Sequence, residues 1–292
     1  MHFVEAKGIL TARKGAVGMN LYRGCTHGCI YCDSRSACYR FAHAFEDIEV
    51  KRNAPELLEC ALKSRRKKCV IGTGAMSDPY MHCEDRLRLT RRCLEIIEQY
   101  GFGAAVQTKS DRVLRDIDLL EAINRRAKCV VQMTLTTWDD ALCAIVEPNV
   151  CNTRRRVEVL EAMRERGIPT LVWLAPILPY INDDGDNVRR ILGACAEVGV
   201  RGVICFDMGL TLREGDREYY YAALDRHFPG LKARYIREYG NRYELPSPRR
   251  DRLMALFRDF CEAKDMLWRV EDCFAYLNHF PEQNRQMSMF DV

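Results

Sequence analysis

The sequence predicts an α/β fold, a partial (β/α)6 TIM-type barrel with a helical C-terminal extension. Two patterns indicate it. From Met19 to Phe206, short apolar runs rich in β-branched residues alternate with longer amphipathic segments, as in parallel strands joined by crossover helices. After Asp207 this alternation gives way to helical segments with many aromatic residues.

The predicted strands and helices follow from this alternation. The six strands are residues 19–23, 69–73, 103–108, 129–135, 170–174 and 202–206. The helices between them are residues 56–64, 85–100, 113–124, 153–166 and 187–198. Three of these helices are followed by a glycine, as helix ends often are: Gly101, Gly167 and Gly199. Six such units suit an incomplete barrel.

The C-terminal part is predicted to be two further helical segments, 216–239 and 249–267, separated around Pro246 and Pro248. We expect these helices to cover the open side of the barrel. The chain is therefore predicted to be one domain, with the barrel at 1–207, its helical extension at 208–280 and a flexible tail at 281–292.

Composition excludes several classes of protein. No stretch reaches the roughly 18 apolar residues that cross a membrane, and residues 1–10 lack the apolar core of a signal peptide. We therefore expect a soluble, cytoplasmic protein, in which 15 cysteines are free thiols rather than disulfides. Four of them, Cys60, Cys93, Cys195 and Cys261, are expected on apolar faces of helices.

The net charge of +4 does not by itself demand a polyanionic partner. Basic residues do cluster at 63–68 and 154–156. Such runs are typical of solvated helix ends, and they would contact phosphates if the partner were a nucleic acid.

The strongest motif is a cysteine triplet with C-x3-C-x2-C spacing, Cys25, Cys29 and Cys32, just after the first predicted strand. In a parallel barrel, loops after strands form the active face. Three thiolates from one loop can bind three irons of a cubane cluster and leave the fourth iron open. Structural zinc needs four ligands, but the chain has no second C-x2-C pair, and His27 inside the loop is a poor fourth ligand.

Because Tyr31 precedes the third cysteine, the motif resembles the hallmark of the radical S-adenosylmethionine (SAM) superfamily. The resemblance implies a 4Fe-4S cluster on Cys25, Cys29 and Cys32, with SAM chelating the open iron. It also implies an external electron donor of the flavodoxin or ferredoxin type. The reduced cluster would cleave SAM to methionine and a 5'-deoxyadenosyl radical, which abstracts hydrogen from a substrate.

Further motifs resemble the spore photoproduct lyase-like branch, up to roughly residue 183. They are Asn-Leu-Tyr-Arg-Gly at 20–24, Ser-Asp-Pro-Tyr at 77–80, Thr-Lys-Ser at 108–110, Glu-Pro at 147–148 and Ala-Pro-Ile-Leu-Pro at 175–179. The resemblance implies that Ser77, Lys109 and Thr134 contact the amino-acid end of SAM, with Thr134 replacing a serine of the lyases.

The resemblance implies more varied roles for three other residues. Glu147 would approach the ribose of SAM, and Tyr31 would line the cofactor pocket mainly through its backbone. Asp78 would either bind the cofactor or cap the turn that follows it. Lys109 could instead be a surface lysine at a strand end, but its place on the active face favours ligand contact.

Two departures from the lyases affect the expected reaction. The lyases have a hydrogen-donating cysteine shortly before the serine-aspartate pair, where this chain has Gly-Ala-Met at 74–76. They also have a tyrosine directly after the third cysteine, where this chain has Asp33. The lyase hydrogen-return route is thus missing, unless Cys38 or Cys83 substitutes, and the chain most resembles branch members of unassigned activity.

Clues to a substrate lie near the C-terminus. Gln-Met-Ser-Met-Phe at 286–290 resembles the peptide by which bacterial repair and replication proteins dock on the sliding clamp, although such a tail can also pack on its own protein. Tyrosines at 219–221, 235 and 239 could stack on bases, but packing in the core is favoured.

These observations leave three functions open. The first is a radical SAM enzyme acting on DNA or a nucleotide. The second is a radical SAM enzyme acting on a peptide or small metabolite, in which case no auxiliary cluster is expected because no second cysteine cluster follows the barrel. The third is a non-catalytic redox sensor, which Ser77, Lys109 and Thr134 argue against because a sensor needs no cofactor pocket.

Overall fold

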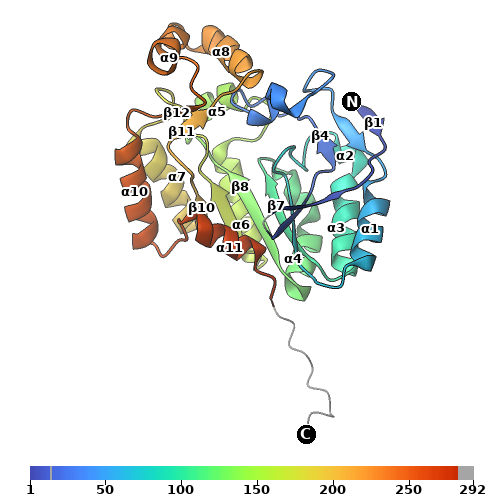
Figure 1. Ribbon diagram of the computed structural model, residues 1–292. Coiled ribbons are helices and arrows are strands. Elements are labelled where there is room, and N and C mark those ends of the chain that lie inside the picture. Colours follow the sequence, from blue (N-terminus) through green and yellow to red (C-terminus); the bar gives the residue numbers. More distant parts are fainter. Residues whose placement is uncertain (14, 282–292) are drawn as a thin grey trace, which may run out of the picture.

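The computed structural model describes residues 1–13 and 15–281 (Figure 1). Its centre is a seven-stranded sheet in the order β10-β9-β8-β7-β6-β3-β2. The strands are β2 (Leu10–Arg13), β3 (Ala16–Met19), β6 (Val70–Thr73), β7 (Gly103–Thr108), β8 (Cys129–Thr134), β9 (Thr170–Trp173) and β10 (Gly202–Ile204). All neighbouring pairs are parallel except β2 with β3. The predicted barrel of six parallel strands is confirmed.

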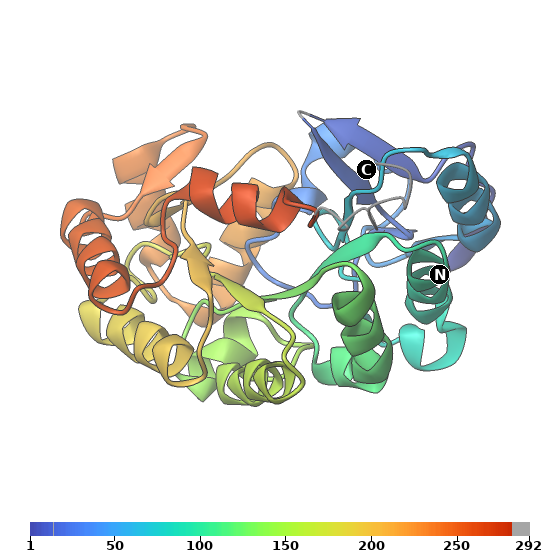
Figure 2. The same ribbon diagram turned by 90° about the horizontal axis from the view of Figure 1, so that it is seen from below.

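Helices cover the outer face of this curved sheet (Figure 2). They are α1 (Ala54–Ser64), α3 (Leu89–Gln99), α4 (Ile117–Arg126), α6 (Thr153–Glu165), α7 (Gly185–Glu197) and α10 (Arg250–Ala263). The short helices α2 (Glu84–Leu87) and α5 (Asp140–Val146) lie in the connections that follow β6 and β8. Side chains alternate along the strands, so Val106 and Val131 pack in the core beneath the helices, whereas Ala105 and Val130 face the interior of the barrel.

The first predicted strand, 19–23, is wrong in its position. The barrel strand is β3, which ends at Met19. Tyr22 and Arg23 form β4 in a separate small sheet with β1 (His2–Val4) and β5 (Glu49–Lys51), in the order β1-β5-β4. The error arose because Leu21 and Tyr22 are buried as deeply as Met19, so the apolar run continues past the end of the barrel strand.

Other differences concern helix boundaries. The predicted helix 85–100 is divided into α2 and α3 at Arg88, whose φ of 47° is left-handed. The segment 216–239 is divided at Gly230 into α8 (Asp216–His227) and α9 (Leu231–Tyr239). Two helices were missed, α5 and α11 (Val270–Asn278). Both are short enough to give little periodic signal.

The C-terminal helices occupy three places. Tyr220 of α8 and Tyr235 of α9 are buried in a cluster that also contains Cys29, Ile30 and Tyr31, which confirms that these tyrosines are core residues. Helix α10 packs against α7 on the outside. The open side of the barrel is closed by α11 and not by the segments 216–239 and 249–267 that were expected to cover it (Figure 2). Cys273 and Leu277 of α11 pack on the strand residues that face the interior.

Several smaller expectations also meet the structure. Cys93, Cys195 and Cys261 are buried, but Cys60 is exposed, so its assignment to an apolar face is wrong. No helix within the described residues is long and apolar enough to cross a membrane. The clamp-like residues 286–290 lie outside the described residues. The division at residue 207 stays a prediction.

Candidate active site

The cysteine loop is held to the protein by backbone hydrogen bonds on two sides. The amide of Cys25 donates to the carbonyl of Phe45 at 3.2 Å. The amide of Ile30 donates to the carbonyl of Val146 at the end of α5, at 3.0 Å, and the amide of Asn149 donates to the carbonyl of His27 at 3.1 Å. The loop therefore depends on segments that are distant in sequence.

All three cysteines line one pocket of about 110 Å³, together with Ser77, Asp78, Lys109 and Thr134. Ser77 and Asp78 follow β6, Lys109 follows β7, and Thr134 ends β8. The side chains of these four residues therefore meet at the carboxyl ends of the strands. The pocket also includes His27, Ser34, Gly74, Ala75, Met76, Gln107 and Thr108. Seven of the nine predicted site residues are thus brought together.

Ser77 and Lys109 are polar residues of this pocket that suit a ligand. The hydroxyl of Ser77 is buried without a hydrogen-bond partner among the described residues. Burial lowers the pKa of Lys109, but electrostatic interaction with Cys29 and with the carboxylate of Glu147 outweighs this and raises it, so its side chain is a cation. A buried hydroxyl and a cation suit the ammonium and carboxylate groups of an amino acid.

The carboxylate of Asp78 is engaged within the protein. Its oxygens accept hydrogen bonds from the hydroxyl of Thr108 at 2.7 Å, the amide of Lys109 at 2.7 Å and the amide of Tyr80 at 2.8 Å. These bonds are those of a side chain that caps the turn after it, which was one of the two roles expected for Asp78. They also fix the loop after β6 to the end of β7. Asp78 thereby positions Lys109.

Tyr31 and Glu147 do not line the pocket. The hydroxyl of Tyr31 donates to Glu147, whose other oxygen pairs with Nη1 of Arg156 at 2.6 Å. Although burial raises the pKa of Glu147, the charges of Arg156 and Lys109 and the bond from Tyr31 together lower it. Glu147 is therefore an anion whose oxygens are engaged by Tyr31 and Arg156, and it lies outside the lining of the pocket.

Arg156 was missed as a site-supporting residue. Its only signal in the sequence was the basic run 154–156, which was read as a solvated helix end or phosphate contact. Arg156 is instead fully buried, Arg154 pairs with Asp140 at 3.1 Å, and Arg155 pairs with Asp111 at 2.9 Å. This run thus offers no free cations for phosphates.

His27 is a second residue whose place the sequence did not indicate. It is 2 % exposed, its Nδ1 lies 3.4 Å from Asp78, and its Nε2 is buried with no partner among the described residues. Burial lowers its pKa, so the ring is neutral. Burial also raises the pKa of the Cys25 thiol to about 12, so the cysteine without iron prefers the thiol form. Bound iron would reverse this preference by stabilising the thiolate.

A second cavity, of about 370 Å³, fills the interior of the barrel next to the cysteine pocket, with which it shares Ala75 and Gln107. Its walls include Gln132 and Trp173 from the strands and Phe274 from α11. Among the described residues, no cysteine other than the triplet lines either cavity, so Cys38 and Cys83 lie outside both linings.

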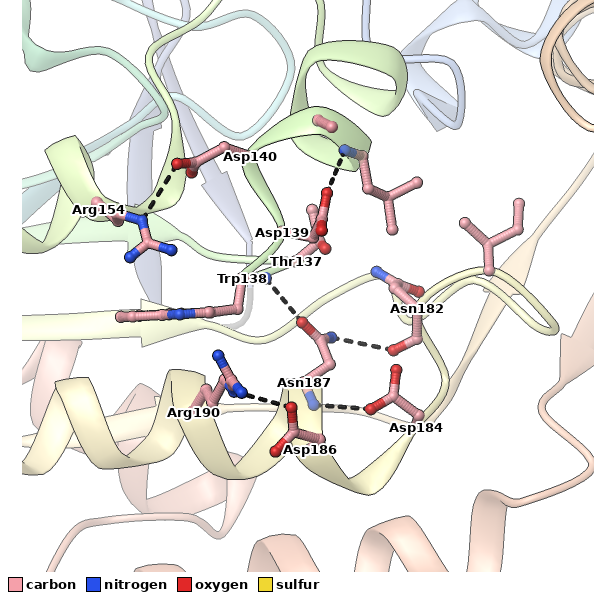
Figure 3. Close-up of a pocket in the computed structure, with 13 residues that line it drawn as sticks. Thr137, Trp138, Asp139, Asp140, Arg154, Asn182, Asp184, Asp186, Asn187 and Arg190 are labelled. Carbon is pink, nitrogen blue, oxygen red and sulfur yellow. Dashed lines mark hydrogen bonds and ion pairs between the residues drawn. The ribbon is translucent and has the colours of Figure 1, made fainter.

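A third cavity, of about 790 Å³, lies outside the barrel between α5, α6 and α7 (Figure 3). Its charged groups are engaged with one another. Asp140 pairs with Arg154, Asp186 pairs with Arg190 at 2.8 Å, and Asp139 and Asp184 cap α5 and α7. It contains none of the predicted site residues.

A partial barrel with three cysteines, a free hydroxyl and a lysine at the strand ends defines a candidate iron-sulfur enzyme that binds an amino-acid-like cofactor. Residues 19–192 match the family model of the radical SAM superfamily, and the chain belongs to this superfamily. The family uses a 4Fe-4S cluster and SAM. The cysteine pocket fits both, because three thiols share it with the unpartnered hydroxyl of Ser77.

Two proteins of similar sequence align with this chain over different shares of their own length. An uncharacterized protein of Mycobacterium tuberculosis is 29% identical over 248 residues, covering 80% of this chain and 70% of the relative. The radical SAM Nalpha-GlyT isomerase of Pseudomonas phage M6 is 24% identical over 180 residues, covering 62% of this chain and 36% of the isomerase.

Among solved structures, spore photoproduct lyase complexed with dinucleoside spore photoproduct aligns with a TM-score of 0.65. The alignment covers 91% of this chain and 80% of the lyase at 14% identity. At this identity the likeness shows the fold alone.

Gly24→Ala is expected to disturb the cysteine loop. Gly24 has a φ of +88°, and an added Cβ would lie 2.3 Å from the carbonyl oxygen of Phe45, which also binds the amide of Cys25. A strained backbone of this kind costs about 1–3 kcal/mol. We expect less iron per protein after anaerobic reconstitution, measured by iron assay.

Gly193→Ala is the matched control. Gly193 lies in α7, and its added Cβ would meet nothing within 4 Å. Alanine is the better helix former, so iron content and stability should not fall. Equal iron contents in the two variants would contradict the role of Gly24.

Proposed function

We propose that this chain is a radical SAM enzyme whose substrate is a nucleobase of DNA or of a nucleotide. The observation that carries the radical chemistry is the shared pocket of Cys25, Cys29, Cys32, Ser77 and Lys109. When bound, the cluster supplies the electron that cleaves SAM to methionine and a 5'-deoxyadenosyl radical, which abstracts a hydrogen atom from the substrate.

The residues have distinct roles in this proposal. Cys25, Cys29 and Cys32 hold the cluster, the Lys109 ammonium binds the carboxylate of SAM, and the Ser77 hydroxyl accepts from its ammonium. Thr134 lines the same pocket and can add a hydrogen bond. Asp78 holds Lys109, while Tyr31, Glu147 and Arg156 support the loop from behind.

The barrel interior supports a planar, polar substrate. Trp173 lies in a cluster with Phe206 and Phe274, with ring centroids 5.8 and 6.0 Å away. Nε1 of Trp173 donates to the side-chain oxygen of Gln132 at 2.9 Å. The side-chain nitrogen of Gln132, and both the side-chain nitrogen and the side-chain oxygen of Gln107, have no hydrogen-bond partner among the described residues. Aromatic faces stack on bases, and amides hydrogen-bond to base edges.

The names of two similar proteins agree with this substrate class. The lyase of the same fold was solved with a dinucleoside photoproduct, and the phage relative is named a GlyT isomerase. Because this chain has Ala75 and Met76 where the lyases place their hydrogen-donating cysteine, we do not propose dimer reversal.

Trp173→Ala tests the substrate assignment. Loss of one stacking partner costs about 1–3 kcal/mol, so we expect the affinity of the cluster-loaded protein with SAM for a single-stranded oligonucleotide to fall about 5- to 150-fold. Fluorescence anisotropy of a labelled oligonucleotide measures it. Phe3→Ala, which removes a 54 % exposed aromatic side chain on β1, is the control and should leave binding unchanged.

Two outcomes would overturn the assignment. If the wild-type protein bound no DNA or RNA oligonucleotide and changed no nucleotide, a peptide or small metabolite would be the better substrate class. If reduced, cluster-loaded protein did not cleave SAM, the protein would be a redox sensor.

The proposed partners follow from the same chemistry. Members of the superfamily need an external electron donor, and we propose one of the flavodoxin or ferredoxin type. We also propose that residues 286–290 dock on the sliding clamp, a contact that would bring the enzyme to DNA in the cytoplasm. A synthetic peptide of residues 281–292 should bind purified clamp, and the same peptide with Phe290→Ala should not.

A further inference from the structure

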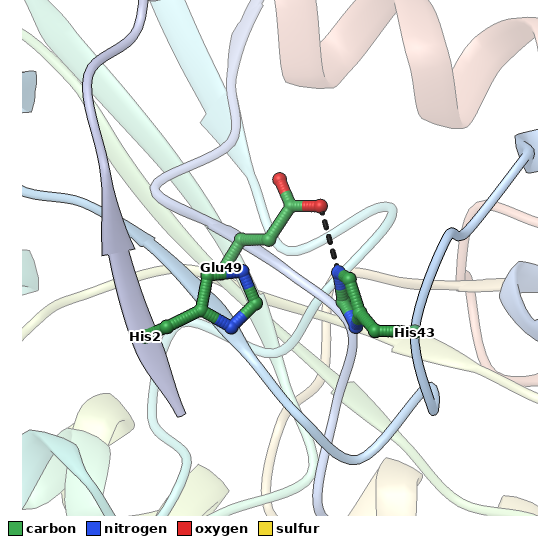
Figure 4. A group of neighbouring side chains, drawn as sticks. All are labelled: His2, His43 and Glu49. Atoms are coloured by element: carbon green, nitrogen blue, oxygen red, sulfur yellow. Dashed lines mark hydrogen bonds and ion pairs between the residues drawn. The ribbon is translucent and has the colours of Figure 1, made fainter.

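The small sheet near the N-terminus brings together two histidines and a glutamate (Figure 4). His2 comes from β1, Glu49 from β5, and His43 from the loop that precedes β5. One ligand atom from each of these residues lies within 4.8 Å of the other two. All three side chains are partly exposed, at 42, 20 and 16 % for His2, His43 and Glu49, so a metal ion in water can reach them.

Each histidine has a second partner that fixes its ring. Nδ1 of His2 lies 3.1 Å from the carboxylate of Asp47, and Nδ1 of His43 lies 2.9 Å from the carbonyl oxygen of Ala44. A histidine that donates from Nδ1 presents the lone pair of Nε2, and metal-binding histidines usually have such a carboxylate or carbonyl partner. Nε2 of His43 already lies 2.9 Å from Glu49.

We propose that His2, His43 and Glu49 bind a zinc ion, with water completing the coordination. Two histidines and one carboxylate are a known ligand set for zinc. The guanidinium of Arg23 lies 2.9 Å from Glu49 and opposes a cation there. Asp47 adds a second negative charge beside the site, although it also pairs with the N-terminal ammonium of Met1. Arg23 is also anchored by the carbonyls of Tyr39 and Arg40, so it keeps its place when Glu49 turns to the metal.

The ion would stabilise the segment that holds the cysteine loop. Residues 43–49 contain two of the ligands, and between them lies Phe45, whose carbonyl accepts from the amide of Cys25. Zinc would thus join β1, β5 and this segment at a site distinct from the cysteine pocket. Its loss should loosen the cysteine loop without removing a cluster ligand.

The test uses untagged, cluster-loaded protein, purified anaerobically and treated with EDTA. After equilibrium dialysis against micromolar Zn²⁺, mass spectrometry of metals should find about one zinc per chain besides the iron. His43→Ala removes a ligand and should weaken zinc binding at least tenfold. Asp47→Asn alters the partner of His2, and also the ion pair with the N-terminal ammonium of Met1, and should weaken zinc binding about 10- to 100-fold.

His227→Ala, a change to an exposed histidine on α8, is the control and should bind zinc as the wild type does. Co²⁺ serves as a spectroscopic probe. Nitrogen and oxygen ligands should give weak visible bands without the thiolate charge-transfer band of a cysteine site. No zinc in the wild type, zinc unchanged in His43→Ala, or a thiolate band with Co²⁺ would each overturn the proposal.

Discussion

Cys29→Ala is expected to abolish formation of 5'-deoxyadenosine from SAM. Cys29 lies in the middle of the triplet, is 7 % exposed and lines the candidate pocket with Cys25 and Cys32. Two thiolates from one loop cannot hold three corners of a cubane cluster, so the variant should lose both its iron and its electron donor to SAM. Anaerobic reconstitution, dithionite reduction and chromatographic detection of 5'-deoxyadenosine measure the loss.

Cys60→Ala provides the matched control. Cys60 is an exposed cysteine on α1, far in sequence from the loop, and its removal should leave iron content and SAM cleavage unchanged. Wild-type activity in Cys29→Ala would contradict the assignment of the triplet. A fully loaded, reduced wild type that makes no 5'-deoxyadenosine would instead favour the sensor function.

Arg156→Met is expected to lower the free energy of unfolding by about 3–5 kcal/mol. The side chains of Arg156 and Glu147 are fully buried and paired at 2.6 Å. Removing the guanidinium leaves a buried carboxylate whose charge is no longer balanced, and this costs far more than the pair itself contributes. Urea unfolding followed by circular dichroism measures the change.

The double variant Arg156→Met with Glu147→Gln tests this explanation. Since it removes both charges, we expect it to recover much of the stability lost in the single variant. If the double variant were as unstable as Arg156→Met, lost packing rather than an unpaired charge would be the cause. The hydrogen bond from Tyr31 should persist, because the glutamine oxygen can accept it.

The buried ion pair of Glu147 and Arg156 should also make the free energy of unfolding depend on pH. The pKa of Glu147 is lower in the folded protein than its ordinary value of 4.5. The pair therefore contributes fully above that value, and its contribution is lost as the pH falls through the folded pKa. Acid unfolding of the wild type should thus begin below pH 4.5, and the double variant should show a weaker dependence in this range.

The sequence predicted the barrel well because its strands are buried on both faces and bounded by amphipathic helices. Val131 and Met133, for example, belong to a run in β8 whose residues are all buried. Seven of the nine site residues met in one pocket. Four of them, Ser77, Asp78, Lys109 and Thr134, lie in or shortly after barrel strands, and parallel strands bring their ends to one edge. The three cysteines come from the loop after β4 of the small sheet.

Long-range pairing set the limits of prediction. Glu147 was expected near the ribose from the family resemblance, and its ion pair with Arg156 was not foreseen because Arg156 looked like part of a solvated charge run. Helix α11 was missed because residues 270–278 form a short segment, and its apolar face acquires meaning only against Ala105 and Leu171 inside the barrel. Neither contact has a signal in local sequence.

Helix α11 has a further consequence for how DNA would reach the cluster. Phe274 and Leu277 wall the cavity of about 370 Å³, and the cysteine pocket adjoins this cavity at Ala75 and Gln107, so a DNA substrate of the proposed function would have to place its base in a confined space. A base in a duplex would have to be extruded from its stack to enter. Extrusion costs least for a damaged, mismatched or single-stranded base, so the shape of the barrel would itself select such bases over intact duplex.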